Sequence, residues 1–217
     1  SSDLVTGIYA LNTDEFFALS GMRQHSLVAS LNALTETMSG ALSVLQAKDA
    51  KSFPAVILSA AQSAGAQVVH ATRAFDPAGV AEQNAVGLTL KAAGIHLQLD
   101  DSYYAVAPGS VTKDDGSPYR VYTPFFKAWF ELANQEPVQL ASGARFERLE
   151  GHRGFDSPDH PQIYEGVPTD MEQIGRVKAG QEFAKKTFES FRRRGALFAY
   201  QEQRNRADLS GTSHLSH

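Results

Sequence analysis

The residues whose types and spacing are best suited to chemistry lie near the carboxyl end of the chain. Tyr200 is followed by a polar stretch, by Gly211 and then by Thr-Ser-His-Leu-Ser, residues 212 to 216. Hydroxyl groups and backbone amides that follow a glycine can converge on a pyrophosphate without crowding it. The same composition is also typical of an ordinary helix cap or turn. The spacing alone leaves both interpretations open.

Other familiar patterns of catalytic or binding residues are missing from the sequence. Its 7 histidines are scattered without a His-x-x-x-His spacing, and it has no cysteine, which argues against a metal site. Neither a Walker loop nor a G-x-G-x-x-G motif occurs, which argues against the common nucleotide-binding motifs. The basic run Arg192 to Arg194 could contact DNA phosphates or simply form a solvated helix face.

The elements that must position these residues follow an alternating pattern. Short β-rich runs at 5–11, 41–45, 66–72 and 95–99 alternate with helical stretches that end at Gly40, Gly65 and Gly94. This alternation is typical of an α/β fold, and we expect a Rossmann-like parallel sheet with flanking helices. A further short helix is expected near 125–133. We therefore assign residues 1–133 to one α/β domain.

The remainder of the chain has a different texture. Residues 134–179 are rich in Pro, Gly, His and charge and have little periodicity, which predicts an interdomain linker. Residues 180–204 combine spaced phenylalanines with a charged surface, which predicts a long helix broken near Gly195. We expect residues 180–217 to begin an all-α domain.

Composition restricts the class of protein. The chain has 217 residues, is 42% hydrophobic and 20% charged, and carries a formal net charge of -4, as is typical of globular proteins. No apolar run approaches the roughly 18 residues of a membrane-spanning helix, and no secretory signal is visible. The lack of cysteine fits a reducing compartment, so we expect a cytoplasmic protein.

Three segments together resemble the DNA photolyase and cryptochrome family. TKDDGSPYRVYTPFFKAW (112–129) is similar to the signature at the end of the family's antenna-binding domain. AGAQVVHATRAFDPAGVAEQNAVGLTLKAAGI (64–95) resembles the strand, acidic-Pro turn and helix that precede that signature. AYQEQRNRADLSGTSHLS (199–216) resembles the start of the family's FAD-binding domain. The resemblance covers nearly the whole chain.

The resemblance implies FAD as a cofactor and favours the pyrophosphate interpretation of the terminal turn. The positions that match the family's flavin contacts are Tyr200, Thr212, Ser213, Leu215 and Ser216. His214 stands where many members have arginine, so one charge-assisted phosphate contact is absent from the expected set.

The resemblance also implies an antenna chromophore, either a folate or a deazaflavin. Folate-binding members usually carry an Asn-Glu pair where this chain has Ala78 and Gly79, so deazaflavin is favoured over methenyltetrahydrofolate. The positions that match deazaflavin contacts are Tyr9, Asn12 and Arg23. Arg23 near a helix N-terminus could hold an anionic ring, and Tyr9 could stack on that ring. The alternative is a solvated Arg23 and a core Tyr9.

The activity implied by the resemblance is that of a deoxyribodipyrimidine photolyase, which repairs UV-damaged DNA with light. The family's first strand lies in the middle of its sheet and has no counterpart before Ser1 in this chain. We therefore expect a gap in the sheet there. Most of the family's catalytic domain has no counterpart either, so we expect the chain alone to be inert. A cryptochrome-type blue-light signalling protein and an isolated α/β chromophore-binding module are the alternatives.

Overall fold

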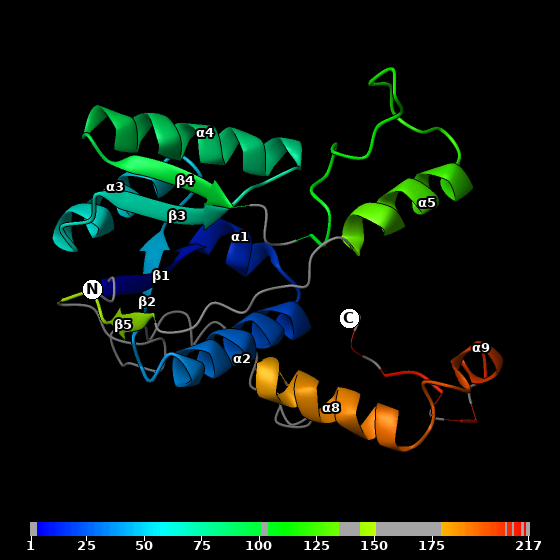
Figure 1. Ribbon diagram of the computed structural model, residues 1–217. Coiled ribbons are helices and arrows are strands. Elements are labelled where there is room, and N and C mark those ends of the chain that lie inside the picture. Colours follow the sequence, from blue (N-terminus) through cyan, green and yellow to red (C-terminus); the bar gives the residue numbers. More distant parts are fainter. Residues whose placement is uncertain are drawn as a thin grey trace. The chain divides into compact units, whose positions relative to one another are not determined.

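The chain forms two compact units (Figure 1). Ser1–Thr13 and Leu45–Glu150 form the first, here called the sheet unit, and Asp14–Val44 and Gly151–His217 form the second, the helical unit. The computed structural model describes residues 4–100, 104–134, 144–150, 179–206, 208–209, 211–213 and 215.

The first sheet is built around β1 (Leu4–Asn12), which lies between β2 (Leu42–Ala47) and β5 (Arg145–Glu147). β5 runs parallel to β1 and pairs only with its first three residues, Leu4 to Thr6. The second half of β1 therefore has no described strand on the edge that faces away from β2.

The second sheet contains β3 (Val68–Thr72) and β4 (His96–Asp100), which run parallel with Val68 opposite His96. Figure 1 shows this pair beside α4. No other described strand pairs with either of them, so β3 and β4 each keep one open edge among the described residues. The sheet unit thus holds two separate sheets, because β1 and β3 are not paired with each other.

The core of the sheet unit lies where α3 (Phe53–Ser63) packs with α4 (Pro77–Ala92). Each helix has a proline in its first turn, where the missing N–H costs no hydrogen bond. Asp76 caps α4 by accepting a hydrogen bond from the Gly79 backbone N–H at 2.9 Å. The main buried cluster consists of Ile57, Ala61, Val86, Leu90 and Ile95.

The last helix of the sheet unit is α5 (Tyr122–Ala133), and none of its residues is buried. Its aromatic rings form a row along one face, in which the Phe126 ring lies 5.8 Å from Tyr122 and 6.1 Å from Trp129. These side chains stand at helical spacing, so the row is a property of the local sequence.

The helical unit contains α1 (Thr13–Ala18), whose last five residues belong to it, α2 (Gly21–Thr37), α8 (Gln181–Arg193) and α9 (Tyr200–Gln203). Gln24 joins α1 to α2, because its Nε2 donates to the backbone oxygens of Phe16 and Leu19 at 3.0 and 3.2 Å. Gly180 lies so close to α2 that a Cβ there would stand 2.5 Å from the Ala33 Cβ. The start of α8 therefore packs against α2.

The expected α/β class is confirmed, since mixed strands and flanking helices occur in the predicted order. The break near Gly195 is also confirmed, because α8 ends at Arg193 and Gly195 adopts a φ of 70°. Two expectations differ from the structure. α5 starts at Tyr122, earlier than expected, because Pro124 is tolerated in the first turn of a helix. The expected linker contains β5, whose pairing partner β1 is distant in sequence.

Candidate functional site

A cavity of about 320 Å³ lies between the two sheets of the sheet unit. Its walls come from β1 on one side, from β3 and β4 on the other, and from α3 and α4, which also form the neighbouring core. The lining residues are Ile8, Tyr9, Ala10, Phe53, Ile57, Val69, His70, Ala71, Thr72, Ala74, Gly79, Glu82, Gln83, Val86, Leu97 and Leu99.

The cavity runs along strand edges and is not confined to one face of a sheet. Ile8 to Ala10 of β1 and Val69 to Thr72 of β3 all contribute to its lining. Successive side chains of a strand point to opposite faces, so a cavity over one face would be lined by every second residue. A lining of consecutive residues places the cavity beside the strands, where an unpaired edge offers backbone N–H and C=O groups.

A polar pair joins the middle of β3 to the carboxyl end of β4. The His70 Nδ1 lies 3.1 Å from Asp100 Oδ2, and both side chains are substantially exposed. A carboxylate acceptor at Nδ1 holds the imidazole ring in place and favours the tautomer whose Nε2 can accept a hydrogen bond. His70 also lines the cavity, so this orientation is set at the cavity itself.

The first turns of α4 form a second polar part of the cavity wall. Gln83 accepts a hydrogen bond through Oε1 from the Ala74 backbone N–H at 3.0 Å, which ties the helix to the segment after β3. At Gly79 an added Cβ would approach Asp76 Oδ2 at 2.7 Å and the Ala74 Cβ at 2.8 Å. The absence of a side chain at Gly79 therefore keeps both the helix cap and the cavity wall in place.

The cavity combines an apolar helix wall with the edges of β1 and β3. Ile57 and Val86 are buried apolar residues of the two helices, whereas the strand edges and His70 provide hydrogen-bonding groups. Ligands of open α/β sheets commonly bind near the carboxyl ends of the strands. Among the described residues, no group of three or more His, Asp or Glu could hold a metal ion.

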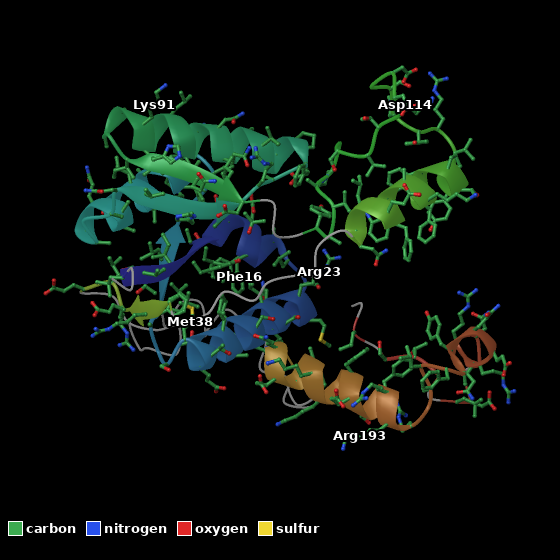
Figure 2. The ribbon with its side chains drawn as sticks, viewed as in Figure 1. Phe16, Arg23, Met38, Lys91, Asp114 and Arg193 are labelled. Atoms are coloured by element: carbon green, nitrogen blue, oxygen red, sulfur yellow. The ribbon has the colours of Figure 1, made fainter. Side chains whose placement is uncertain are left out.

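The three residues expected to contact an antenna chromophore fall in both units. Tyr9 is half-buried in β1 and lines the cavity, and Asn12 is the half-buried last residue of the same strand. Arg23 is exposed in the first turn of α2, in the helical unit (Figure 2). Only Tyr9 therefore belongs to the cavity of the sheet unit.

The residues expected to contact FAD lie in the helical unit, as far as they are described. Tyr200 begins α9 and packs edge-on against the buried Phe191, with the ring centres 6.4 Å apart. Thr212 and Ser213 are half-buried and Leu215 is exposed, whereas Ser216, like His214, lies outside the described residues.

The terminal turn is held against α9 by a glycine. Gly211 is buried, and a Cβ there would collide with the backbone oxygen of Gln203. Because Gln203 is the last residue of α9, this close approach brings Thr212 and Ser213 to the helix that Tyr200 begins. Their hydroxyls and backbone amides are of the kind that binds phosphate, so the described residues fit part of a flavin pyrophosphate site.

Neither His70 nor Asp100 was predicted from the sequence as a functional residue. The two residues are thirty positions apart, and the parallel register of β3 and β4 brings them together by pairing Thr72 with Asp100. Aligning the two predicted strands at their carboxyl ends would have placed them near each other.

Comparison with known proteins gives a family match over most of the chain. The model of the family described as DNA photolyase matches residues 1–142. A deoxyribodipyrimidine photo-lyase of Synechococcus sp. (strain ATCC 27144) is 30% identical over 169 residues, which cover 72% of this chain and 32% of that protein. The chain thus spans about a third of the length of this curated relative.

Two solved structures share the fold. A bacterial class III photolyase from Agrobacterium tumefaciens gives a TM-score of 0.73 at 22% identity. The match covers 99% of this chain and 44% of the photolyase chain. The Synechocystis sp. PCC6803 cryptochrome gives a TM-score of 0.74 at 16% identity. This match covers 93% of this chain and 43% of the cryptochrome chain. None of the helices that the structure describes is long and apolar enough to span a bilayer.

Proposed function

The chain belongs to the DNA photolyase family, and on that premise we propose that it is the antenna part of a deoxyribodipyrimidine photolyase. In this proposal the whole protein binds UV-damaged DNA and splits pyrimidine dimers with light. The match of the family model over residues 1–142 carries the proposal. The curated relatives named deoxyribodipyrimidine photo-lyase support repair as the activity.

We assign the antenna chromophore to the sheet unit, in which Tyr9 and Asn12 stand toward the carboxyl end of β1. Ligands of open α/β sheets commonly bind near that end of the strands. The match of these two positions favours a deazaflavin-type antenna over methenyltetrahydrofolate.

We assign the flavin contacts of this chain to the helical unit. Tyr200, Thr212 and Ser213 would hold the ribose and pyrophosphate of FAD, with Leu215 and Ser216 completing the turn. FAD, when bound, supplies the light-driven electron chemistry, and the residues of this chain bind and orient it. Phe191 supports this role, because its buried ring fixes Tyr200 from one side.

Spectroscopy of the purified chain tests the chromophore assignments. The chain is expressed with a deazaflavin-producing host and without one, its absorption spectrum is recorded, and any released chromophore is identified by mass. We expect deazaflavin to be retained in the first preparation. A chain that retains methenyltetrahydrofolate, or no chromophore in either host, would contradict the antenna assignment.

A repair assay tests the activity. The longer protein that contains this sequence is mixed with DNA carrying cyclobutane or 6-4 lesions and illuminated with blue light, and the loss of lesions is measured. We expect repair of one lesion class, and no repair by the 217-residue chain. A long protein that binds FAD but repairs neither lesion would favour the cryptochrome-type signalling role.

A further inference from the structure

We infer that Arg206, held in position by Asp208, supplies the positive charge that a phosphate group bound at the terminal turn needs. This inference deepens the flavin assignment of the helical unit, and it rests on the proposed function for the identity of the phosphate compound. It adds two residues to the proposed FAD contacts, one that binds phosphate and one that positions the first.

The first step is the charge of the terminal turn. Thr212 and Ser213 offer hydroxyl and amide donors, but residues 207–217 contain no Lys or Arg. A pyrophosphate is negatively charged, and hydrogen bonds to it from charged donors are about twice as strong as those from neutral ones. Arg206 is the last Lys or Arg of the sequence, so it is the cation that most closely precedes the turn.

The second step is the path of the backbone, which brings Arg206 and the turn to one carbonyl group. The Arg206 N–H donates a hydrogen bond to the Gln203 backbone oxygen at 2.9 Å. Gly211 packs so closely on the same oxygen that a Cβ there would collide with it. The Arg206 backbone oxygen in turn accepts from the Leu209 N–H at 3.2 Å. The backbone of Arg206 therefore lies beside the residue that precedes Thr212.

The third step is the orientation of the Arg206 side chain. Its Nε donates to Asp208 Oδ1 at 2.8 Å and its Nη2 donates to Oδ2 at 2.6 Å, so the guanidinium and the carboxylate form a two-bond fork. The hydrogen bond from Arg206 lowers the pKa of Asp208, so the carboxylate is charged at neutral pH. Both side chains are more than half exposed, so the fork adds little to stability and mainly fixes where the guanidinium lies.

The fork leaves part of the guanidinium able to bind a ligand. A guanidinium has five N–H donors, and the fork with Asp208 uses two of them. An arginine that is already oriented loses less conformational entropy when it binds than one that samples many rotamers. Arg206 is thus a preoriented cation beside the neutral donors of Thr212 and Ser213, and together they form a donor set suited to a pyrophosphate.

Flavin binding by the longer protein that contains this sequence tests the role of Arg206. The flavin-free protein is titrated with FAD and with riboflavin, which has the same ring system but no phosphate, and quenching of flavin fluorescence gives each dissociation constant. We expect Arg206→Gln to weaken FAD at least about tenfold and riboflavin less than about twofold, because only FAD presents phosphates. Arg193→Gln removes an exposed arginine of α8 and is the matched control, expected to change neither. Equal losses for FAD and riboflavin would overturn the inference.

A double-mutant cycle tests the positioning role of Asp208. We expect Asp208→Asn to weaken FAD about threefold, because a disordered guanidinium costs more affinity than an exposed, screened carboxylate charge does. In the Arg206→Gln background the same change should have no effect, since Asp208 acts through Arg206. An Asp208→Asn effect of equal size in both backgrounds would show that Asp208 does not position Arg206.

Binding of inorganic pyrophosphate to the 217-residue chain separates this inference from the proposed function. Phosphorus NMR follows the titration, and we expect Arg206→Gln to weaken pyrophosphate at least about tenfold. If pyrophosphate binding depends on Arg206 but the longer protein does not bind FAD, the inference is supported and the proposed function is contradicted. If the longer protein binds FAD and repairs DNA, but neither FAD nor pyrophosphate binding depends on Arg206, the inference is overturned and the proposed function is supported. Absence of binding by both ligands contradicts both.

Discussion

The two units of the chain build their candidate sites in different ways. In the sheet unit the cavity is enclosed by strands and helices that are distant in sequence, and a cluster of fully apolar residues supports it. In the helical unit the described residues that are proposed to contact FAD lie within one short stretch, and many apolar side chains are exposed, among them Phe198 at 89%. Three of its ion pairs, Glu182 with Lys185, Glu189 with Arg192 and Arg206 with Asp208, join residues at most three positions apart.

This difference teaches that the cavity of the sheet unit is formed by tertiary structure, whereas the residues proposed to contact FAD are arranged mainly by local sequence. We therefore expect core substitutions to affect the sheet unit most. Substitutions in the terminal turn should affect that turn alone. The following predictions test this contrast, from the largest expected effect to the smallest.

Leu90→Ala should produce the largest loss of stability. Leu90 is 0% exposed within the main cluster of the sheet unit, so its truncation leaves a cavity among Ile57, Val86 and Ile95. We expect the free energy of unfolding to fall by about 4 kcal/mol. Urea denaturation measures it, with Leu88→Ala on the exposed face as the control, expected within about 0.5 kcal/mol of the original chain. Similar losses for both variants would mean that the cluster is not the core of this unit.

Phe191→Ala should weaken the helical unit by a smaller amount. Phe191 is 4% exposed and contacts the Tyr200 ring, so its loss removes the main buried aromatic support of α9. We expect a loss of about 3 kcal/mol, measured by the same denaturation. Phe198→Ala, at a residue 89% exposed, is the control and should have almost no effect. A negligible effect of Phe191→Ala would show that the helical unit lacks a core of its own.

Two glycine substitutions contrast the units directly. Gly211→Ala places a Cβ against the Gln203 backbone, so we expect a loss of about 2 kcal/mol and displacement of the terminal turn. Gly87→Ala in α4 meets only Leu97 Cδ2 at 3.5 Å, an ordinary contact, and should stabilise the sheet unit by about 0.5 kcal/mol. Thermal unfolding measures both, and a neutral Gly211→Ala would contradict the close packing of the turn on α9.

The smallest effect is expected for an exposed ion pair of α8. Arg192 NH2 donates to Glu189 Oε2 at 2.8 Å, and this hydrogen bond, with the charge of Arg192, lowers the pKa of Glu189. A carboxyl whose pKa is lowered by folding stabilises the folded state above its unfolded pKa, and this contribution disappears as the pH falls through the folded pKa. Both side chains are largely exposed, so the contribution is small.

Arg192→Gln should therefore raise the pKa of Glu189 toward its usual value with almost no change in stability at neutral pH. Titration of the glutamate side chain by NMR measures the pKa. Lys185→Gln, which removes the partner of Glu182, is the matched control and should leave Glu189 unaffected. An unchanged pKa of Glu189 in Arg192→Gln would show that the pair does not form in solution.

The sequence by itself determined the order of the elements, the family and the short-range features. Local patterns predict the helix ends at Gly65 and Gly94, the aromatic row of α5 and the segment from Tyr200 to Ser216. Each of these features depends on neighbours in the chain. Tyr9 was proposed for a ligand site from the family resemblance, because the matching position lies at the end of one predicted strand.

Tertiary structure alone decided which residues surround the space between β1 and β3. The partial pairing of β5 with β1 and the contact of His70 with Asp100 join residues at least thirty positions apart, and the open edge of β3 depends on which strands pair. Their positions depend on strand register and on the packing of α3 and α4, which minimise exposed apolar surface over the whole unit. Local periodicity does not predict these pairings, because the same strands could pair in another order with the same side-chain pattern.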